Sequence, residues 1–422
     1  MRFVHTSDWH LGFRQYNIET RFQDFARAAS RTVNRILEIN PDFVLHTGDL
    51  FHDNRPTAGV IRMAVRLLRR LSDEGIPVYM IRGNHDTHEN AKGGSIMHLL
   101  EELDLIHFVN NEMVSIGEID IIGINYKPVR ALDKKLTELV DKNIDQIKND
   151  GKFSILALHN FIQGQLDGHE IPLTRLADLG FDYIGGGHYH IPWKNERFNI
   201  YTPGSSEATS SNDWNREDAV GGIGIYSSFY LVESEKDGSG WKKPVVTDCK
   251  VPVRPRITAH IESSAENLEQ LEKEITEYLG AKLSQVDEMT ATIQEYKTEE
   301  MKKPMLNMSI STNLDQAEVV NLDRRKILDA FINPAKLEIS SLSVVELPDV
   351  TNSSGVIAAT MRELIKEVES EIGESVSEFT GFVDQIISEF QDVPKSRFSK
   401  MQDEAVEEYV TKALEMTLEA EK

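Results

Sequence analysis

The first 250 residues alternate short apolar runs with longer segments in which apolar residues recur every three or four positions. The short runs are typical of strands and the wider spacing is typical of amphipathic helices. The runs predict strands at Arg2–Thr6, Phe43–Thr47, Pro77–Arg82, Ile119–Ile124, Phe153–His159, Asp182–Gly186, Asn199–Thr202 and Ile223–Val232. The spaced segments predict helices at 21–39, 57–73, 94–103 and 131–148. Strands that alternate with helices indicate an α/β sandwich.

Beyond residue 250 the pattern changes. Val251–Pro255 contains two prolines, which cannot continue a helix or a central strand, so we expect a linker there. The next segments predict strands at 256–262, 305–311 and 337–346 and a helix at 265–279. A polar stretch from Leu347 to Gly355 predicts a second linker. The expected domains are therefore 1–250, a small α+β domain at 251–347, and a helical segment at 348–422.

The last segment carries apolar residues at helical spacing. They are Ile357, Met361, Leu364, Ile365, Val368 and Ile372, followed by Phe379, Val383, Ile386, Ile387 and Phe390. No other core is evident in this segment, so we expect the stripe to be buried in a groove or coiled coil of a partner protein. The alternative is that the helices pack back on their own domain.

Composition and charge exclude some classes of protein. No apolar run approaches the ~20 residues that span a bilayer, and a signal-peptide pattern does not open the sequence, so we expect a cytoplasmic protein. The single Cys249 forbids an internal disulfide and a thiolate metal cluster. The net charge of −23 is uneven, because residues 349–422 hold 17 acidic and 7 basic residues. The charge therefore does not argue against nucleic acid at a site elsewhere.

Five short polar motifs follow predicted strands in the first 250 residues. In chain order they are Asp8-Trp9-His10, Gly48-Asp49-Leu50-Phe51-His52-Asp53, Gly83-Asn84-His85-Asp86, His159-Asn160 and Gly187-His188-Tyr189-His190. Strand ends hold loops rigidly at one edge of an α/β sheet, so the motifs should converge. The glycines beside Asp49, Asn84 and His188 allow close approach without a Cβ clash. Each motif alone is weak, but five in this order predict a metal site with oxygen and nitrogen ligands.

The ordered motifs resemble the calcineurin-like metallophosphoesterase superfamily. Within it, Asp8-x-His10, Gly-Asp-Leu-Phe-His and Gly-Asn-His-Asp resemble most closely the archaeal-type meiotic recombination eleven family, nucleases of double-strand-break repair. The resemblance covers about residues 1–250. It implies a four-layer sandwich of two mixed β-sheets flanked by helices, a DNA-binding capping domain, and C-terminal helices that bind a coiled-coil ABC-type ATPase of the Rad-fifty family.

Residue by residue, the resemblance implies two Mn²⁺ ions. One ion would be bound by Asp8, His10, Asp49 and His190, and the other by Asp49, Asn84, His159 and His188. A shared carboxylate would offset the repulsion between two cations about 3.5–4 Å apart. Ligands without sulfur suit Mn²⁺, and Fe²⁺ or Zn²⁺ remain alternatives. The ions would activate a water molecule and hold the phosphate for in-line attack.

Further residues near the motifs have expected roles. His85 is expected to protonate the leaving 3′ oxygen, and the resemblance implies that His52 engages the DNA phosphates. The alternative for His52 is a loop histidine that holds Asp49 in place. Arg14 and Arg55 are expected to contact phosphates beside the ions. Asp86 is expected to orient a ligating histidine.

The resemblance also implies a homodimer contact through the helices at 57–73 and 94–103. Their apolar residues at helical spacing are Ile61, Val65, Leu68, Met97, Leu100 and Leu103, and spacing cannot separate core from interface. The Ser205-Ser206 pair resembles a family loop, but Thr202 interrupts the spacing, so no phosphate contact is assigned to it.

The expected function is that of a Mn²⁺-dependent nuclease in double-strand-break repair. It would act as a 3′–5′ exonuclease on duplex ends and an endonuclease on single strands, with the ATPase. Two alternatives stay open: a phosphatase or cyclic-nucleotide phosphodiesterase with the same ions, and a scaffold that bridges DNA ends with little catalysis of its own.

Overall fold

The computed structural model describes residues 1–86, 95–149, 151–166, 170–214, 219–238, 240–297, 301, 303–332 and 336–341. All of them belong to one compact unit, Met1–Ser343. The partner-binding stripe expected between Ile357 and Phe390 lies outside these residues. None of the helices described here is long and apolar enough to cross a membrane.

The larger sheet of the described residues has eight strands and contains the first three polar motifs. Its order is β16-β15-β14-β11-β1-β2-β3-β4, and the neighbours from β1 to β4 are parallel. The strands are β1 (Arg2–Thr6), β2 (Phe43–His46), β3 (Val78–Met80), β4 (His107–Phe108), β11 (Ile223–Glu233), β14 (Val245–Ser263), β15 (Met305–Thr312) and β16 (Lys336–Ser341). β11 runs antiparallel to both β1 and β14, so the sheet is mixed.

The second sheet has six strands among the described residues and contains the other two motifs. Its order is β5-β6-β7-β8-β10-β9, with β6, β7, β8 and β10 parallel. The strands are β5 (Glu112–Ile116), β6 (Ile119–Ile124), β7 (Phe153–His159), β8 (Tyr183–Gly187), β9 (Trp193–Asn195) and β10 (Ile200–Thr202). A small hairpin of β12 (Lys236–Asp237) and β13 (Gly240–Trp241) stands apart from both sheets.

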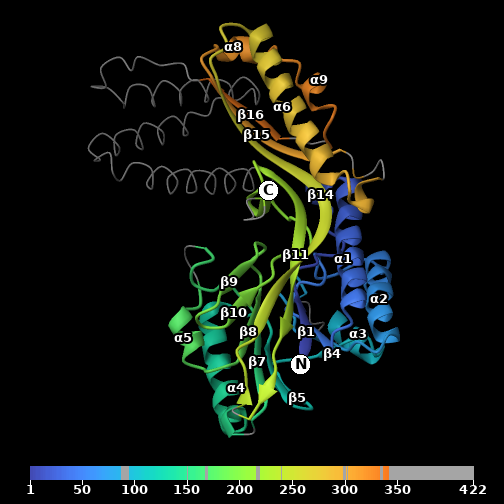
Figure 1. The fold of residues 1–422 in the computed structure, drawn as a ribbon, viewed down its shortest axis with the longest axis vertical. Coiled ribbons are helices and arrows are strands. Elements are labelled where there is room, and N and C mark those ends of the chain that lie inside the picture. Colours follow the sequence, from blue (N-terminus) through green and yellow to red (C-terminus); the bar gives the residue numbers. More distant parts are fainter. Residues whose placement is uncertain are drawn as a thin grey trace, which may run out of the picture. The chain divides into compact units, whose positions relative to one another are not determined.

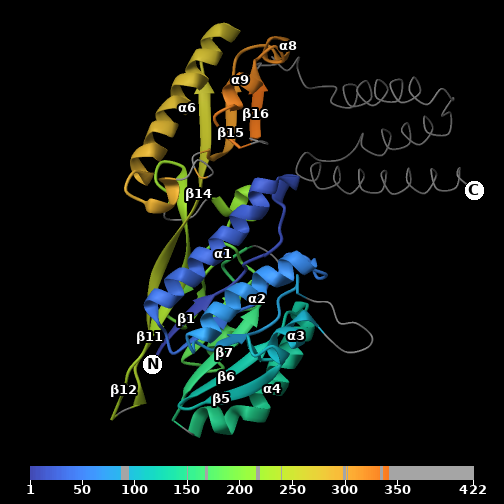
Figure 2. The same cartoon turned by 90° about the vertical axis from the view of Figure 1, so that its right-hand side faces the viewer.

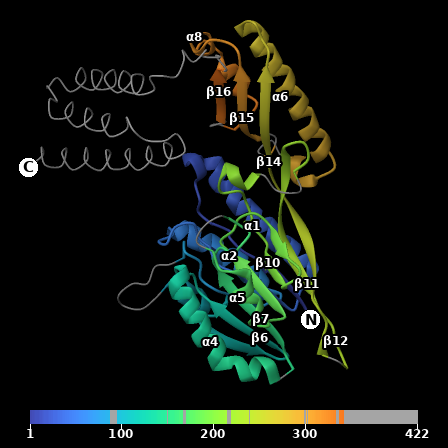
Figure 3. The same ribbon diagram turned by 90° about the vertical axis from the view of Figure 1, so that its left-hand side faces the viewer.

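Helices cover the outer faces of both sheets, which gives the four layers that the resemblance implied (Figure 1). One outer layer holds α1 (Glu19–Ile39), α2 (Ala58–Asp73) and α3 (Ile96–Glu102), and the other holds α4 (Val129–Asn149) and α5 (Leu173–Ala177). Figure 3 shows α4 against β6 and β7. The predicted helices in these regions are therefore confirmed, with small shifts at their ends.

Alternation along the strands explains the layers. On β1, Phe3 faces the second sheet and packs with Phe43 and Phe153, whereas Val4 faces α1 and packs with Val33. Every one of these side chains is almost fully buried. Successive residues of a strand point to opposite faces, so each strand of the larger sheet contributes to two cores.

The linker expected at Val251–Pro255 is wrong, because these residues lie within the long strand β14. Pro252 pairs with Tyr226 of β11, and the register shifts at a bulge between Gly224 and Tyr226, next to Pro255. On the other side, β15 begins to pair with β14 only at Arg256. The prolines therefore stand where β14 has a single neighbour, and no ladder hydrogen bond is lost on the open edge.

The residues after β14 form a smaller α+β layer with its own core. α6 (Leu268–Thr290) covers one face of β14, β15 and β16, and the short α8 (Gln316–Val319) and α9 (Arg324–Leu328) lie near it (Figure 2). The expected helix at 265–279 is thus present and longer than predicted. Its N-cap Asn267 accepts a hydrogen bond from the Gln270 amide, at 3.0 Å.

Candidate metal centre

The five motifs meet at the carboxyl ends of five parallel strands drawn from both sheets. Asp8 and His10 follow β1, Asp49 follows β2, and Asn84 follows β3, while His159 ends β7. His188 and His190 follow β8. Parallel strands end at the same edge of a sheet, and the two sheets face each other, so residues up to 180 positions apart become neighbours.

The backbone at the site is strained in a way that only a fixed scaffold tolerates. Asp8, His10, Asp49 and His188 all have positive φ, between 45° and 80°. A residue other than glycine in this left-handed region is uncommon and costs roughly 1–3 kcal/mol, and such residues cluster at functional sites. The strain aims the side chains of consecutive loop residues into one space.

Two glycines allow the loops to approach closely, as the sequence predicted. A Cβ at Gly83 would lie 2.1 Å from Asp49 Oδ1, and one at Gly187 would lie 2.2 Å from the carbonyl oxygen of Thr47 and 2.6 Å from His159 Nδ1. Real Cβ atoms do not come this close to backbone or to a fixed ring. Glycine is therefore required at both positions.

One half of the site contains Asp8, His10 and His190, whose ligand atoms lie within 4.8 Å of one another. His10 Nε2 is 3.8 Å and His190 Nε2 is 3.7 Å from Asp8 Oδ1, and the two nitrogens are 3.2 Å apart. The His188 amide donates to both oxygens of Asp8, at 3.3 and 3.1 Å, which fixes the carboxylate.

The other half contains Asp49, His159 and His188, again within 4.8 Å of one another. His159 Nε2 lies 3.3 Å from Asp49 Oδ2 and 3.1 Å from Asn84 Oδ1. His159 Nδ1 donates to the carbonyl oxygen of Thr47 at 2.7 Å, which places the proton on Nδ1 and leaves Nε2 toward the site.

The donor set fits cations. Asp49 Oδ2 is buried and meets no hydrogen-bond donor in suitable geometry. It lies between His159 Nε2, at 3.3 Å, and His10 Nε2, at 3.8 Å. A buried anionic oxygen that accepts no hydrogen bond from the described residues is costly. Positive charge in both halves, with Asp49 between them, would offset that cost.

The pKa values of the candidate ligands indicate which of them are charged before an ion binds. Burial lowers the pKa of His10 and lowers that of His188 to about 3, so both rings are neutral at pH 7. Burial acts to raise the pKa of Asp49, but the charge of His159, 3.3 Å away, outweighs it and holds the pKa below the usual range. Burial likewise acts to lower the pKa of His159, but Asp49 raises it to about 9. At pH 7 His10 and His188 are therefore neutral imidazoles beside the Asp49 carboxylate, whereas His159 is protonated and would have to release its Nε2 proton when an ion binds.

A stack of aromatic rings borders the site on the side of His10. His52 lies between Phe13, with ring centroids 3.7 Å apart, and His85, with centroids 4.9 Å apart. His85 stands edge-on to His10 at 4.9 Å. The His85 amide, rather than His52, donates to Asp49 Oδ1, at 2.9 Å. Both interpretations of His52, a contact to DNA phosphates and a loop histidine that holds Asp49 in place, therefore stay open.

The structure corrects the role expected of Asp86 and shows what the serine loop contacts. Asp86 orients no ligand histidine among the described residues; it accepts hydrogen bonds from the amides of Leu50, Phe51 and Gly83, so it ties the Asp49 loop to the Asn84 loop. Ser205 and Ser206 are buried, and their amides donate to the carbonyl oxygens of His190 and Asp8, respectively. The serine loop thus fastens two ligand loops instead of facing a substrate.

Sequence reasoning missed Thr209 and Asp213. Thr209 Oγ1 lies 2.6 Å from His190 Nδ1 and donates to Asp213 Oδ2 at 2.7 Å. Burial acts to raise the pKa of Asp213, but hydrogen bonds from His190 and Thr209 hold it below its usual range. No spacing rule links these residues to His190. They meet because the β9–β10 hairpin returns the chain to it, with Thr202 opposite Trp193.

The two arginines expected to contact DNA lie at the surface. Arg14 is half-exposed and forms an ion pair of 2.7 Å with Glu19, and Arg55 is exposed.

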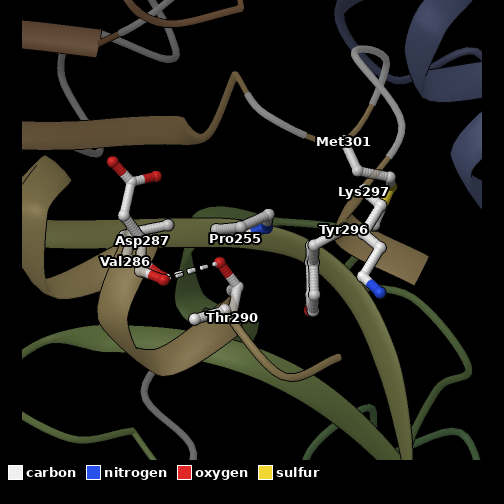
Figure 4. A pocket seen from close by; sticks show the side chains of 8 residues that line it. Pro255, Val286, Asp287, Thr290, Tyr296, Lys297 and Met301 are labelled. Atoms are coloured by element: carbon white, nitrogen blue, oxygen red, sulfur yellow. Dashed lines mark hydrogen bonds between the residues drawn. The ribbon is translucent and has the colours of Figure 1, made fainter. Parts of the chain in front are cut away.

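A separate hollow at the C-terminal end of α6 has Tyr296 and Lys297 on one side and Thr290 on the other (Figure 4). The five motifs contribute no residue to it, so it is not the candidate centre.

The arrangement defines a class of protein. Residues 1–192 match the calcineurin-like phosphoesterase family. This part of the chain is therefore similar to calcineurin-like phosphoesterases, a family of metal-dependent phosphoester hydrolases that implies a dinuclear metal centre. The resemblance to this superfamily noted from the motifs is confirmed for these residues.

Archaeal proteins named "DNA double-strand break repair protein Mre11" are similar to the chain. The protein of Methanococcus maripaludis is 37% identical over 195 residues, 45% of this chain and 52% of that protein. The protein of Saccharolobus solfataricus is 32% identical over 265 residues, 61% of this chain and 65% of that protein. The chain thus spans about half to two thirds of these relatives. Among solved structures, a dimetal phosphatase from Danio rerio has a TM-score of 0.38 at 10% identity, covering 60% of this chain and 99% of that one.

Proposed function

We propose that the chain is a Mn²⁺-dependent DNA nuclease of double-strand-break repair. One observation carries the proposal: seven residues of metal-ligand type, from five loops, converge around a buried Asp49 oxygen that accepts no hydrogen bond from the described residues. The printed name of the relatives, which concerns repair of double-strand breaks, supports DNA as the substrate. Mn²⁺ suits a set of carboxylate, amide and imidazole ligands.

The proposed ligand assignment follows the two halves of the site. Asp8, His10 and His190 would hold one ion, and Asn84, His159 and His188 would hold the other. Asp49 would be shared by both ions. When bound, such a pair of ions activates water and stabilises the charge that develops on a phosphate. The chain's own contribution is rigidity, because buried hydrogen bonds fix Asp8, Asp49 and His159 before any substrate arrives.

His85 is the proposed proton donor to the leaving 3′ oxygen. Its Nδ1 lies 2.5 Å from the carbonyl oxygen of His52, which only accepts, so Nδ1 carries a proton. Nε2 is then the atom that holds or releases the second proton. The stack on His52, itself backed by Phe13, keeps the ring of His85 in place. His52 is the middle ring of this stack and is half-buried, consistent with its proposed contact to DNA phosphates.

The substrate and polarity rest on the resemblance. We expect 3′–5′ exonuclease activity on duplex ends and endonuclease activity on single strands. Arg14 and Arg55, both on loops beside the site, would contact the backbone of the DNA without reading sequence. The pairing of Arg14 with Glu19 implies that DNA must compete with an exposed ion pair, which is weak.

The proposed partners are a second copy of the chain and a coiled-coil ABC-type ATPase of the Rad-fifty family. In the helices expected to dimerise, Leu68, Met97 and Leu100 are buried in the domain core. Leu99 and Leu103 remain 41% and 39% exposed on α3 and after it, which supports a contact there. The ATPase would bind the helices beyond Asp349. Truncation after Asp349 should abolish co-purification of the ATPase, and unchanged affinity would contradict this part of the proposal.

The nuclease assignment is tested with an end-labelled DNA duplex in the presence of Mn²⁺. The unaltered chain should shorten the labelled strand, and chelation should stop the reaction. His85→Gln should lower turnover by two or more orders of magnitude while two ions remain bound. His107→Gln changes an exposed histidine of β4 and serves as the matched control. Equal turnover of the His85 variant would refute the assigned role.

The same assay separates the alternatives. A phosphatase or cyclic-nucleotide phosphodiesterase would hydrolyse small phosphoesters and leave the duplex intact. A scaffold would bind DNA with the same affinity in the unaltered chain and in Asp8→Ala, and neither would cleave it. The nuclease is supported if the unaltered chain cleaves DNA and the Asp8→Ala variant binds DNA without cleaving it.

A further inference from the structure

The segment that follows β10 contributes no proposed ligand and yet is attached to the metal centre. The Ser205 amide donates to His190 O at 3.0 Å, and the Ser206 amide donates to Asp8 O at 3.2 Å. Both serines are buried. The segment is therefore part of the wall of the site, and its polar side chains stand where they can act on the ligands.

Hydrogen-bond chemistry in this segment determines which nitrogen of His190 carries a proton. Asp213 is 7% exposed and, when ionised, only accepts; it accepts from Thr209 Oγ1 at 2.7 Å and from Thr209 N at 2.8 Å. A threonine hydroxyl has one proton, and here Asp213 takes it. Thr209 Oγ1 therefore accepts at the 2.6 Å contact with His190 Nδ1, so Nδ1 must be protonated.

The direct contact between Asp213 and His190 also indicates a proton on His190 Nδ1. Asp213 Oδ2 also lies 3.4 Å from His190 Nδ1, and a carboxylate oxygen again requires a proton on that nitrogen. His190 Nε2 then has a free lone pair. It points to the metal centre, 3.7 Å from Asp8 Oδ1 and 3.2 Å from His10 Nε2.

We infer that Thr209 and Asp213 are positioning residues that fix the tautomer of His190 and so set the affinity of the metal position formed with Asp8 and His10. The inference rests on the proposed metal centre. It extends that proposal, because the tautomers of the histidines in the two halves of the centre are then fixed by different groups. His159, in the other half, is held in its tautomer by the backbone carbonyl of Thr47, which no side-chain substitution removes.

The buried side chains of Gln15 and Arg21 donate hydrogen bonds to the backbone of this segment. Gln15 Nε2 donates to Thr209 O at 2.6 Å, and Arg21 Nη2 donates to Ala208 O at 3.1 Å. Arg21 also forms a buried ion pair of 3.2 Å with Glu207. Thr209 therefore keeps its place when its hydroxyl alone is changed, and substitution there tests the hydrogen bond and not the fold of the loop.

The experiment compares Mn²⁺ binding by the full chain and three variants, using calorimetric titration. Thr209→Val, which keeps the shape and removes the hydroxyl, should weaken one of the two ions about 10–100-fold and leave the other unchanged. Thr209→Ser should bind both ions as the unaltered chain does. Asp213→Asn should weaken the same ion, because an amide can donate to Thr209 and move the His190 proton to Nε2.

Asp120→Asn is the matched control for loss of a buried carboxylate. Asp120 is 1% exposed and accepts from Ser115 Oγ and Lys152 Nζ, on β5 and before β7, away from the ligand loops. Both ions should bind normally to this variant. Equal binding of both ions by Thr209→Val, or equal weakening by Thr209→Ser, would overturn the inference.

A second measurement separates this inference from the proposed function. The ¹⁵N spectra of the histidine side chains in the chelated protein report the tautomer of His190 without any ion. The proton should sit on Nδ1 in the unaltered chain and in Thr209→Ser, and shift toward Nε2 in Asp213→Asn. Absence of metal binding by the unaltered chain would refute the metal centre, while the spectra would still decide the tautomer. An unaltered spectrum in Asp213→Asn would refute the positioning role.

Discussion

Two buried histidines of the larger sheet should respond in opposite ways to the same substitution. His5 and His46 are both fully buried. His5 uses both nitrogens, toward the Tyr183 hydroxyl at 2.8 Å and Thr47 Oγ1 at 3.0 Å. Among the described residues neither nitrogen of His46 has a hydrogen-bond partner, and its ring lies against Trp9 with centroids 5.0 Å apart. We therefore expect His46→Leu to stabilise the protein and His5→Leu to destabilise it.

The magnitude follows from desolvation and from pH. A buried polar group without a partner costs about 1–3 kcal/mol, so His46→Leu should gain about that much at pH 8. Burial, aided by His159, lowers the pKa of His46 from 6.5 to about 3. The unfolded chain binds a proton below pH 6.5 and the folded chain does not, so His46 costs stability as the pH falls from 6.5 toward 3. At pH 5.5 this cost is about 1.4 kcal/mol, which adds to the gain from leucine.

His5 has the same titration and the opposite balance. Burial, aided by His46, lowers its pKa to about 3 as well. His5→Leu removes that acid penalty but leaves the Tyr183 hydroxyl buried without its partner and deprives Thr47 of a contact. The loss should be about 1–3 kcal/mol at pH 8 and comes mainly from Tyr183, because Thr47 Oγ1 still donates to the carbonyl oxygen of Gly186 at 3.1 Å.

Urea denaturation in the presence of a chelator, at pH 8 and pH 5.5, measures both variants. The chelator is needed because protons and metal ions compete for other histidines of the site. The free energy of unfolding of His46→Leu should exceed that of the unaltered chain by a larger margin at pH 5.5. A margin independent of pH, or a less stable His46 variant at both pH values, would refute the reasoning.

Three further predictions concern the site and the fold. Gly83→Ala should abolish binding of both ions, because the new Cβ would lie 2.1 Å from Asp49 Oδ1, whereas Gly280→Ala in α6, where nothing lies within 4 Å, should bind them normally; metal content per chain decides this. Arg254→Met should lower the free energy of unfolding by about 1–3 kcal/mol, measured by urea, because Asp24 loses two hydrogen bonds, at 2.6 and 2.9 Å, and keeps the one from Arg21 Nη1 at 2.8 Å. Chelation should lower the melting temperature, and Mn²⁺ at 100 times its dissociation constant should restore about 2.7 kcal/mol for each ion; an unchanged melting temperature would argue against bound metal.

The sequence alone determined the site to a large extent. Each motif is local: Asp8-x-His10 and His188-x-His190 place two ligands on one loop, and glycine beside a ligand marks a close approach that Gly83 and Gly187 indeed make. These motifs can be recognised in the sequence because the alternation of apolar residues shows where each strand ends and its loop begins. The order of the motifs then identified the phosphoesterase domain.

Only the tertiary structure decided which groups act on those ligands from other parts of the chain. Thr209 and Asp213 reach His190 through the β9–β10 hairpin, and their own spacing carries no sign of it. His5 and His46 look alike in sequence, and their partners alone make one a hydrogen-bonded support and the other an unsatisfied ring. The two prolines of β14 predicted a linker because sequence cannot show that one edge of the strand is open there. A hydrogen bond depends on distance in space, and that distance is fixed only when the sheets pack.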